Sequence, residues 1–212
     1  MGKYKTIKHK NRKWLLSYFI AQILIFTLFS GIITLTFRDV EVFLGRVKSL
    51  NGMLLLITFP LTIILEGILS SDMKAILVFW KLRDPLPGFR AFTNIAPNDS
   101  RIDMDKLCKL FPTGLPNEPR KQNQEWYKLY RMYENKPLVL DAHNSFLLTR
   151  DLAALTAVLI PISLVAHLLW GSTNYRIFCH SILNVVILII TCLSSQNYGK
   201  RFVANVLIEA SL

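Results

Sequence analysis

The sequence has few cysteines and no familiar catalytic motif. Its three cysteines are odd in number and have no CxxC spacing, which excludes a disulfide-stapled secreted module. No Walker loop and no GxGxxG, GxSxG or HExxH pattern occurs, so no enzyme class is indicated. His9, His143, His167 and His180 are scattered over different parts of the chain, and a metal site would need His143 to find Asp141 or distant partners. We therefore expect neither a metal nor another cofactor.

Charge is scarce and biased towards one sign. Only 18% of the 212 residues are charged, whereas 52% are apolar, yet the net charge is +11. Disordered chains need low hydrophobicity, so disorder is excluded. A nucleic-acid-binding domain can be this basic but would not be this apolar. A multi-pass membrane protein has both properties.

Four apolar segments reach or approach the roughly 20 residues that a helix needs to cross a bilayer. They are residues 14–37, 52–70, 152–170 and 177–194. We therefore expect an all-α polytopic membrane protein with four transmembrane helices. The first segment follows a basic stretch, as in a signal peptide. Its apolar run exceeds the about 7–15 residues of such peptides, so we interpret it as a retained signal anchor.

The spans divide the chain into five parts. These are a basic arm (1–13), a transmembrane hairpin (14–70), a helical insert (71–151), a second hairpin (152–194) and a tail (195–212). The arm, insert and tail hold six, thirteen and two Lys and Arg residues, against four on the other side. The positive-inside rule therefore predicts that both termini and the insert are cytoplasmic.

The start of the insert has a helical pattern. Met73, Ile76, Leu77 and Trp80 recur at helical spacing. This stripe fits either an interfacial helix on anionic headgroups or an extension of the second span. Residues 84–92 carry turn signals, and residues 94–103 continue as a predicted loop.

Further helices are predicted beyond this loop. Asp103 is placed to cap a short helix, and Asn117 is a good N-cap for another that ends near residue 135. From Pro137 the pattern stays helical to Trp170, which predicts one helix of more than 30 residues.

Aromatic side chains form the candidate partner-binding surface of the insert. Trp126, Tyr130 and Tyr133 share one face of the predicted helix, and Trp80 stands near the membrane. The face is either a packing contact or a ligand platform. Because the insert is small, its core needs a second subunit or the membrane face to complete it.

Four residues are candidates for an intramembrane or gating role. Glu66 lies inside the second predicted span, where an acidic side chain is costly and therefore indicates a functional site. Arg150 is predicted at the same membrane face. The two either form a helix–helix ion pair or serve a pore or proton role. Pro60 and Pro161 lie within spans as static kinks or hinges.

Other polar or basic residues suggest lipid and helix contacts. Small or polar faces suit a bundle that forms homo-oligomers; they contain Gln22, Ser30, Gly31, Thr34, Ser163 and Asn184. The basic arm is predicted to contact anionic lipid; its cations are Lys3, Lys5, Lys8, Lys10, Arg12 and Lys13. Direct nucleic-acid binding is not expected, since the insert has 13 basic against 10 acidic residues.

At the level of architecture, the whole chain resembles the small multi-pass membrane components of bacterial anti-phage systems, such as the Kiwa membrane subunit and retron-associated membrane effectors. Four spans, a compact cytoplasmic insert and the lack of a catalytic motif carry this resemblance. It implies sensing or executing damage at the bacterial inner membrane with a soluble cytoplasmic partner. We expect an oligomeric sensor, anchor or membrane-permeabilising effector that is not an enzyme. The alternative is a transporter subunit or membrane-embedded enzyme that uses Glu66 and Arg150.

Overall fold

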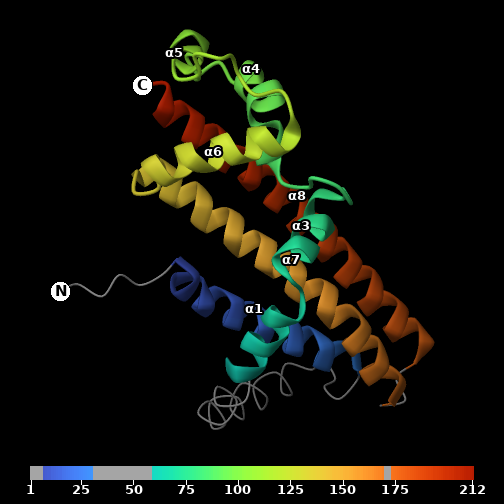
Figure 1. Ribbon diagram of the computed structural model, residues 1–212. Helices are drawn as coiled ribbons and strands as arrows, with labels where there is room; N and C mark the ends of the chain where they lie inside the picture. The colour runs from blue at the N-terminus through green and yellow to red at the C-terminus, as the bar shows by residue number, and fades with distance from the viewer. Residues whose placement is uncertain (1–6, 31–58, 170–172) are drawn as a thin grey trace, which may run out of the picture. The chain divides into compact units, whose positions relative to one another are not determined.

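The computed structural model describes residues 7–30, 59–169 and 173–212, and every regular element in them is a helix (Figure 1). The elements are α1 (Ile7–Ser30), the segment Phe59–Ile68, α3 (Ser71–Phe79), the 3₁₀-helix η1 (Pro87–Arg90), the π-helical turn η2 (Ala91–Ile95), α4 (Ala96–Asn98), α5 (Met104–Lys109), α6 (Pro119–Tyr133), α7 (Pro137–Leu169) and α8 (Asn174–Ala210). The prediction of an all-α chain is confirmed for these residues.

Three of the helices are long and apolar enough to cross a membrane. They are α1 from Asn11 onward, α7 and α8. The second predicted span, residues 52–70, lies outside the described residues up to residue 58, and its described part is the shorter apolar helix Phe59–Ile68. The chain is thus a membrane protein by the length and composition of these helices, and a fourth span stays a prediction.

The two longest helices are α7 and α8. Helix α7 has 33 residues, as the uninterrupted pattern from Pro137 predicts, and is about 50 Å long. Helix α8 has 37 residues and continues to Ala210, so the residues expected as a tail after residue 194 extend this helix.

The chain divides into two compact units. The first contains residues 1–70 and 151–191, and the second contains residues 71–150 and 192–212. In the first unit, Phe19, Leu65 and Leu155 form a buried cluster from three helices. Lipid tails are as apolar as such side chains, so helices in a membrane also rely on close packing and polar contacts.

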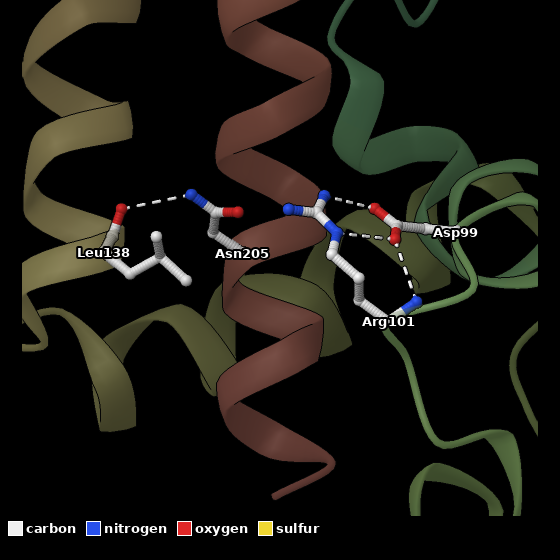
Figure 2. Close-up of polar contacts among 4 residues, drawn as sticks. All are labelled: Asp99, Arg101, Leu138 and Asn205. Atoms are coloured by element: carbon white, nitrogen blue, oxygen red, sulfur yellow. Dashed lines mark hydrogen bonds and ion pairs between the residues drawn. The ribbon is translucent and has the colours of Figure 1, made fainter.

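The second unit is built around the last part of α8. Phe202, Val203 and Leu207 are buried there. Trp126 Nε1 of α6 donates to the Val203 carbonyl oxygen at 3.3 Å. Asn205 Nδ2 donates to the Leu138 carbonyl oxygen of α7 at 3.1 Å (Figure 2). The apolar face of this helix thus supplies core that the insert alone was expected to lack.

Helix α6 begins without the predicted cap. Its N-cap position is Glu118, which makes no side-chain cap, so the prediction for Asn117 is wrong. Asn117 lies one residue too early. Its carbonyl oxygen instead accepts from Nε2 of the buried Gln122 at 2.9 Å. The Gln122 Oε1 accepts from the backbone nitrogens of Phe92 and Thr93 at 3.1 and 3.2 Å, which ties α6 to η2.

The buried face of α3 differs from the predicted stripe. Met73 and Trp80 are 52% and 61% exposed, whereas Ala75, Val78 and Phe79 are buried. The helix ends at Phe79 because Trp80 has a left-handed φ of 53°. The predicted i, i+7 repeat therefore does not continue to Trp80.

The segment between η1 and α6 contains short helices. Residues 94–98, expected as loop, belong to η2 and α4. The Asp103 cap is confirmed, since its side chain accepts from the Lys106 backbone nitrogen at 3.1 Å. Arg101 closes the preceding turn by donating to both carboxylate oxygens of Asp99, from Nε at 2.9 Å and from Nη2 at 2.6 Å (Figure 2).

Candidate functional site

The first unit contains a chain of buried polar side chains, which we call the intramembrane polar chain: His167 of α7 and His180 and Asn184 of α8. The Nε2 atom of His167 lies 2.9 Å from Nδ1 of His180, and Nε2 of His180 lies 2.9 Å from Nδ2 of Asn184. All three side chains are at most 2% exposed. Buried polar groups in an apolar helical unit are costly and mark functional sites in membrane proteins.

One assignment of protons satisfies both contacts. An amide nitrogen can only donate, so Asn184 Nδ2 donates to His180 Nε2. The proton of a neutral His180 then lies on Nδ1 and is donated to His167 Nε2. Both rings are neutral in this arrangement, and the donors point in one direction from Asn184 to His167. The Asn184 Oδ1 has no hydrogen-bond partner in the structure.

Aromatic side chains of α1 surround this chain. The ring of Phe26 lies 4.5 Å from that of His167, and the ring of Phe29 is stacked at 5.4 Å from that of His180, measured between centroids. These neighbours are apolar, so they offer the imidazoles no counter-charge.

A second polar link joins α1 to α7. The hydroxyl oxygens of Tyr18 and Thr156 are 2.5 Å apart, and Gln22 Nε2 donates to the Tyr18 hydroxyl at 2.8 Å. A cavity of about 260 Å³ brings the two links together, because Gln22 lines it together with His180 and Asn184. Its remaining wall is mainly apolar. The first unit therefore holds a small polar-edged cavity.

Sequence reasoning missed the pairing of the histidines. The prediction that they are scattered is wrong for His167 and His180, which are in contact between α7 and α8. A signal was available. His167 lies near the end of the third predicted span and His180 near the start of the fourth, and a hairpin brings such positions to similar depth.

The predicted gating residues Glu66 and Arg150 are assigned to different compact units. Glu66 is half-buried in Phe59–Ile68 and belongs to the first unit, whereas Arg150 belongs to the second. Their pairing stays a prediction. Pro161 lies inside α7, and Pro60 is exposed at the second residue of Phe59–Ile68. The hinge role of both prolines also stays a prediction.

The second unit contains a larger cavity of about 500 Å³, which we call the aromatic cavity. Six of its lining side chains are rings: Trp126, Tyr127, Tyr130, His143, Phe146 and Phe202. Arg131 and Arg150 also line it. Two of the four predicted partner-binding aromatics, Trp126 and Tyr130, therefore meet here, whereas Tyr133 and Trp80 are not in its lining.

The rings of the cavity pack on Phe202 of α8. The ring of His143 is stacked on Phe202 at 4.6 Å, and those of Trp126 and Tyr130 meet it edge-on at 5.3 Å. The hydroxyl of Tyr130 lies 3.2 Å from His143 Nδ1. Burial, followed by the charge of Glu134, raises the pKa of Tyr130. The hydroxyl therefore stays protonated and can donate to His143.

The predicted lipid-contact residues lie at the start of the chain. Lys3 and Lys5 fall outside the described residues. Lys8, Lys10, Arg12 and Lys13 lie in α1, so this part of the arm is helical. The Arg12 guanidinium carbon stands 5.9 Å from the centroid of the Phe59 ring, within cation–π range. Lipid contact stays a prediction for all six residues.

No cluster of three or more His, Cys, Asp or Glu side chains suited to a metal ion occurs in the part of the chain that the structure describes. Comparisons with protein-family models, with curated proteins and with solved structures found no match to this chain. The intramembrane polar chain and the aromatic cavity are therefore the features of the described residues that bear on function.

Proposed function

We propose that this chain is a proton-responsive effector of membrane permeability. The observation that carries the proposal is the intramembrane polar chain, in which two buried histidines and an asparagine are hydrogen-bonded inside an apolar helical unit. Histidine changes charge within the physiological pH range, and polar chains with histidine form proton relays in membrane transport proteins.

The hydrogen bonds suggest how protonation acts. A doubly protonated His180 has two N–H donors, so it can no longer accept from Asn184 Nδ2. Rotation of the Asn184 amide would present Oδ1, now without a partner, as the acceptor. The new positive charge would face Phe26 and Phe29 from α1 and His167 from α7. A positive charge placed beside these apolar rings favours passing the proton on or opening the helices to water.

The proposed setting is the bacterial inner membrane. The strong Lys and Arg asymmetry supports four spans with both termini and the segment after the second span in the cytoplasm. A homo-oligomer is proposed because one small bundle leaves little room for a solute pathway. A soluble cytoplasmic partner would act as trigger or target, and sensing and anchoring would be parts of the same role.

Proteoliposomes test the proposal. The purified chain is reconstituted with an internal pH-sensitive dye, and proton flux is measured from about pH 7.5 down to about pH 4, because burial among apolar rings disfavours the charged form of a histidine. We expect flux above that of protein-free vesicles, a rise as the pH falls, and loss in His180→Phe. The matched control is Thr191→Val on α8, since the Thr191 hydroxyl donates to the carbonyl oxygens of Ile187 and Leu188 on its own helix, both at 2.9 Å. Equal flux in His180→Phe and the wild type would contradict the proposal.

The resemblance to anti-phage membrane components supports a role in defence. That role predicts that host cells carrying the chain depolarise after infection and release fewer phage. Cells carrying His180→Phe should behave as cells without the chain. If membrane potential and phage yield are unaffected by the wild-type chain, the defence role is excluded for that host and phage.

A second candidate function is a transporter subunit or membrane-embedded enzyme that uses Glu66 and Arg150. It is favoured by the half-buried Glu66 of an apolar helix and by the place of Arg150 in the aromatic cavity. This function predicts substrate-dependent turnover or uptake that is lost in Glu66→Gln, whereas proton flux through the polar chain is retained.

A further inference from the structure

The aromatic cavity of the second unit has the features of a ligand site. The cavity measures about 500 Å³ and is partly open to the surface, so a ligand could enter it. That volume lies within the roughly 300–1,000 Å³ of small-molecule sites, which are lined by rings and a few placed polar groups. We propose that it binds an anionic ligand with a planar ring, of the mononucleotide class. This inference is independent of the intramembrane polar chain.

The rings select for a planar group. Trp126 and Tyr130 are nearly parallel, with an interplanar angle of 15° and centroids 5.9 Å apart. Tyr127 lines the cavity beside them and keeps 52% of its surface exposed. An exposed ring in a partly enclosed space offers a stacking face, and stacking on aromatic side chains is a common way to hold a nucleobase.

The charged groups select for an anion. Arg131 and Arg150 line the cavity, and its lining contains no Asp or Glu. Guanidinium groups match the geometry of phosphate and bind it through two hydrogen bonds. Arg131 already forms an ion pair with Glu134, with 2.9 Å between Nη1 and Oε2, and the Arg131 side chain is 61% exposed. A phosphate group would therefore compete with one carboxylate for Arg131.

A glycine shapes the wall beside the rings. A Cβ atom at Gly88 would collide with Asn123 Oδ1 and lie 3.0 Å from Trp126 Cε3. The amide of Asn123 and the ring of Trp126 can therefore approach the chain closely at this point. Asn123 lines the cavity too, and its amide can both donate to and accept from the edge of a base.

Calorimetric titration of the full chain in neutral-lipid nanodiscs tests the proposal. The probes are the 5′-monophosphates of adenosine, guanosine, cytidine and uridine, compared with the matching nucleosides and with inorganic phosphate. We expect saturable binding of at least one nucleotide, at least about tenfold tighter than its nucleoside or phosphate alone. If no nucleotide binds the folded wild-type chain, the proposal is overturned. If phosphate alone binds as tightly, the role of the rings is overturned.

Side chains of α6 and its C-cap Glu134 provide matched variants. Arg131→Gln should weaken binding about tenfold, the usual effect of losing one charge-assisted hydrogen bond, whereas Arg120→Gln on the same helix should bind as the wild type. Glu134→Gln should tighten binding, because it releases Arg131 from its carboxylate partner. Tyr127→Ala should weaken binding, and Tyr133→Ala should not. Equal affinity of Arg131→Gln and Arg120→Gln, with unchanged helix content, would overturn the assignment of the site.

Discussion

The Nε2 atom of His167 lies 2.9 Å from the Nδ1 atom of His180, and both side chains are almost fully buried. This contact joins α7 to α8 within the first unit. Because one proton is shared between the two nitrogens, the ring nitrogen that carries the proton in one histidine fixes the tautomer of the other. The pair therefore behaves as one polar unit.

The histidine pair should contribute measurably to the stability of the first unit. His167→Leu leaves the Nδ1 donor of His180 unpaired, and we expect a loss of about 1–2 kcal/mol, the range for polar contacts between membrane helices. Unfolding in mixed micelles measures it. The double variant His167→Leu/His180→Leu should lose less than the sum of the two single variants. Strictly additive losses would show that the rings do not interact.

Gln122 should be a stability hot spot of the second unit. Gln122→Leu leaves the backbone N–H of Phe92 and the carbonyl of Asn117 without this partner. Each buried group left unpaired costs about 1–3 kcal/mol, so a loss of about 2–4 kcal/mol is expected in chemical unfolding. Gln124→Leu is the control, since Gln124 is exposed on the same helix and its replacement should change stability by less than about 0.5 kcal/mol.

Two glycines should respond oppositely to alanine. A Cβ atom at Gly199 would lie 2.8 Å from Phe79 Cζ and 3.1 Å from Phe146 Cε2, so Gly199→Ala should destabilise by about 1–3 kcal/mol. Nothing lies within 4 Å of a Cβ atom at Gly67. Gly67→Ala should therefore be neutral or stabilise its helix by up to about 1 kcal/mol. Thermal unfolding of both variants tests these two expectations. A Gly199→Ala variant more stable than the wild type would contradict the close packing at this position.

The turn that precedes α5 should weaken in acid. The side-chain hydrogen bond from Arg101 lowers the pKa of Asp99 below its ordinary value. The stabilisation is present above that ordinary value, about 3.9, and is lost as pH falls through the lower folded pKa. The protection factors of the amides of residues 99–103, which correct the exchange rates for the intrinsic effect of pH, should therefore fall in acid in the wild type. In Asp99→Asn this acid-dependent change should be smaller, and an identical profile would argue against the pair.

Local signals in the sequence predicted much of the helical framework. The unbroken pattern after Pro137 predicts α7, and Asp103 predicts the start of α5, because both depend on neighbours within one turn. The exposed face of α3 and the tie between Gln122 and η2 depend on residues far apart in the sequence. No spacing rule reports such contacts.

The candidate sites could be predicted only in part from the sequence. Trp126 and Tyr130 were identified from their shared helix face, but Phe202 and His143 join them only through the packing of α8 and α7 in the second unit. The histidine pair depends on a hairpin that sets two positions at one depth. Both sites thus arise from tertiary contacts between helices. The sequence predicts that these helices exist, but it does not predict which of their faces pack together.

Helix α8 supplies apolar residues to the first unit and core residues to the second. During synthesis, residues 71–150 leave the ribosome well before residues 192–212. The second unit therefore cannot complete its core until the apolar part of α8 has itself been made. The rings that pack on Phe202 of α8 therefore stay without this partner until α8 has been synthesised.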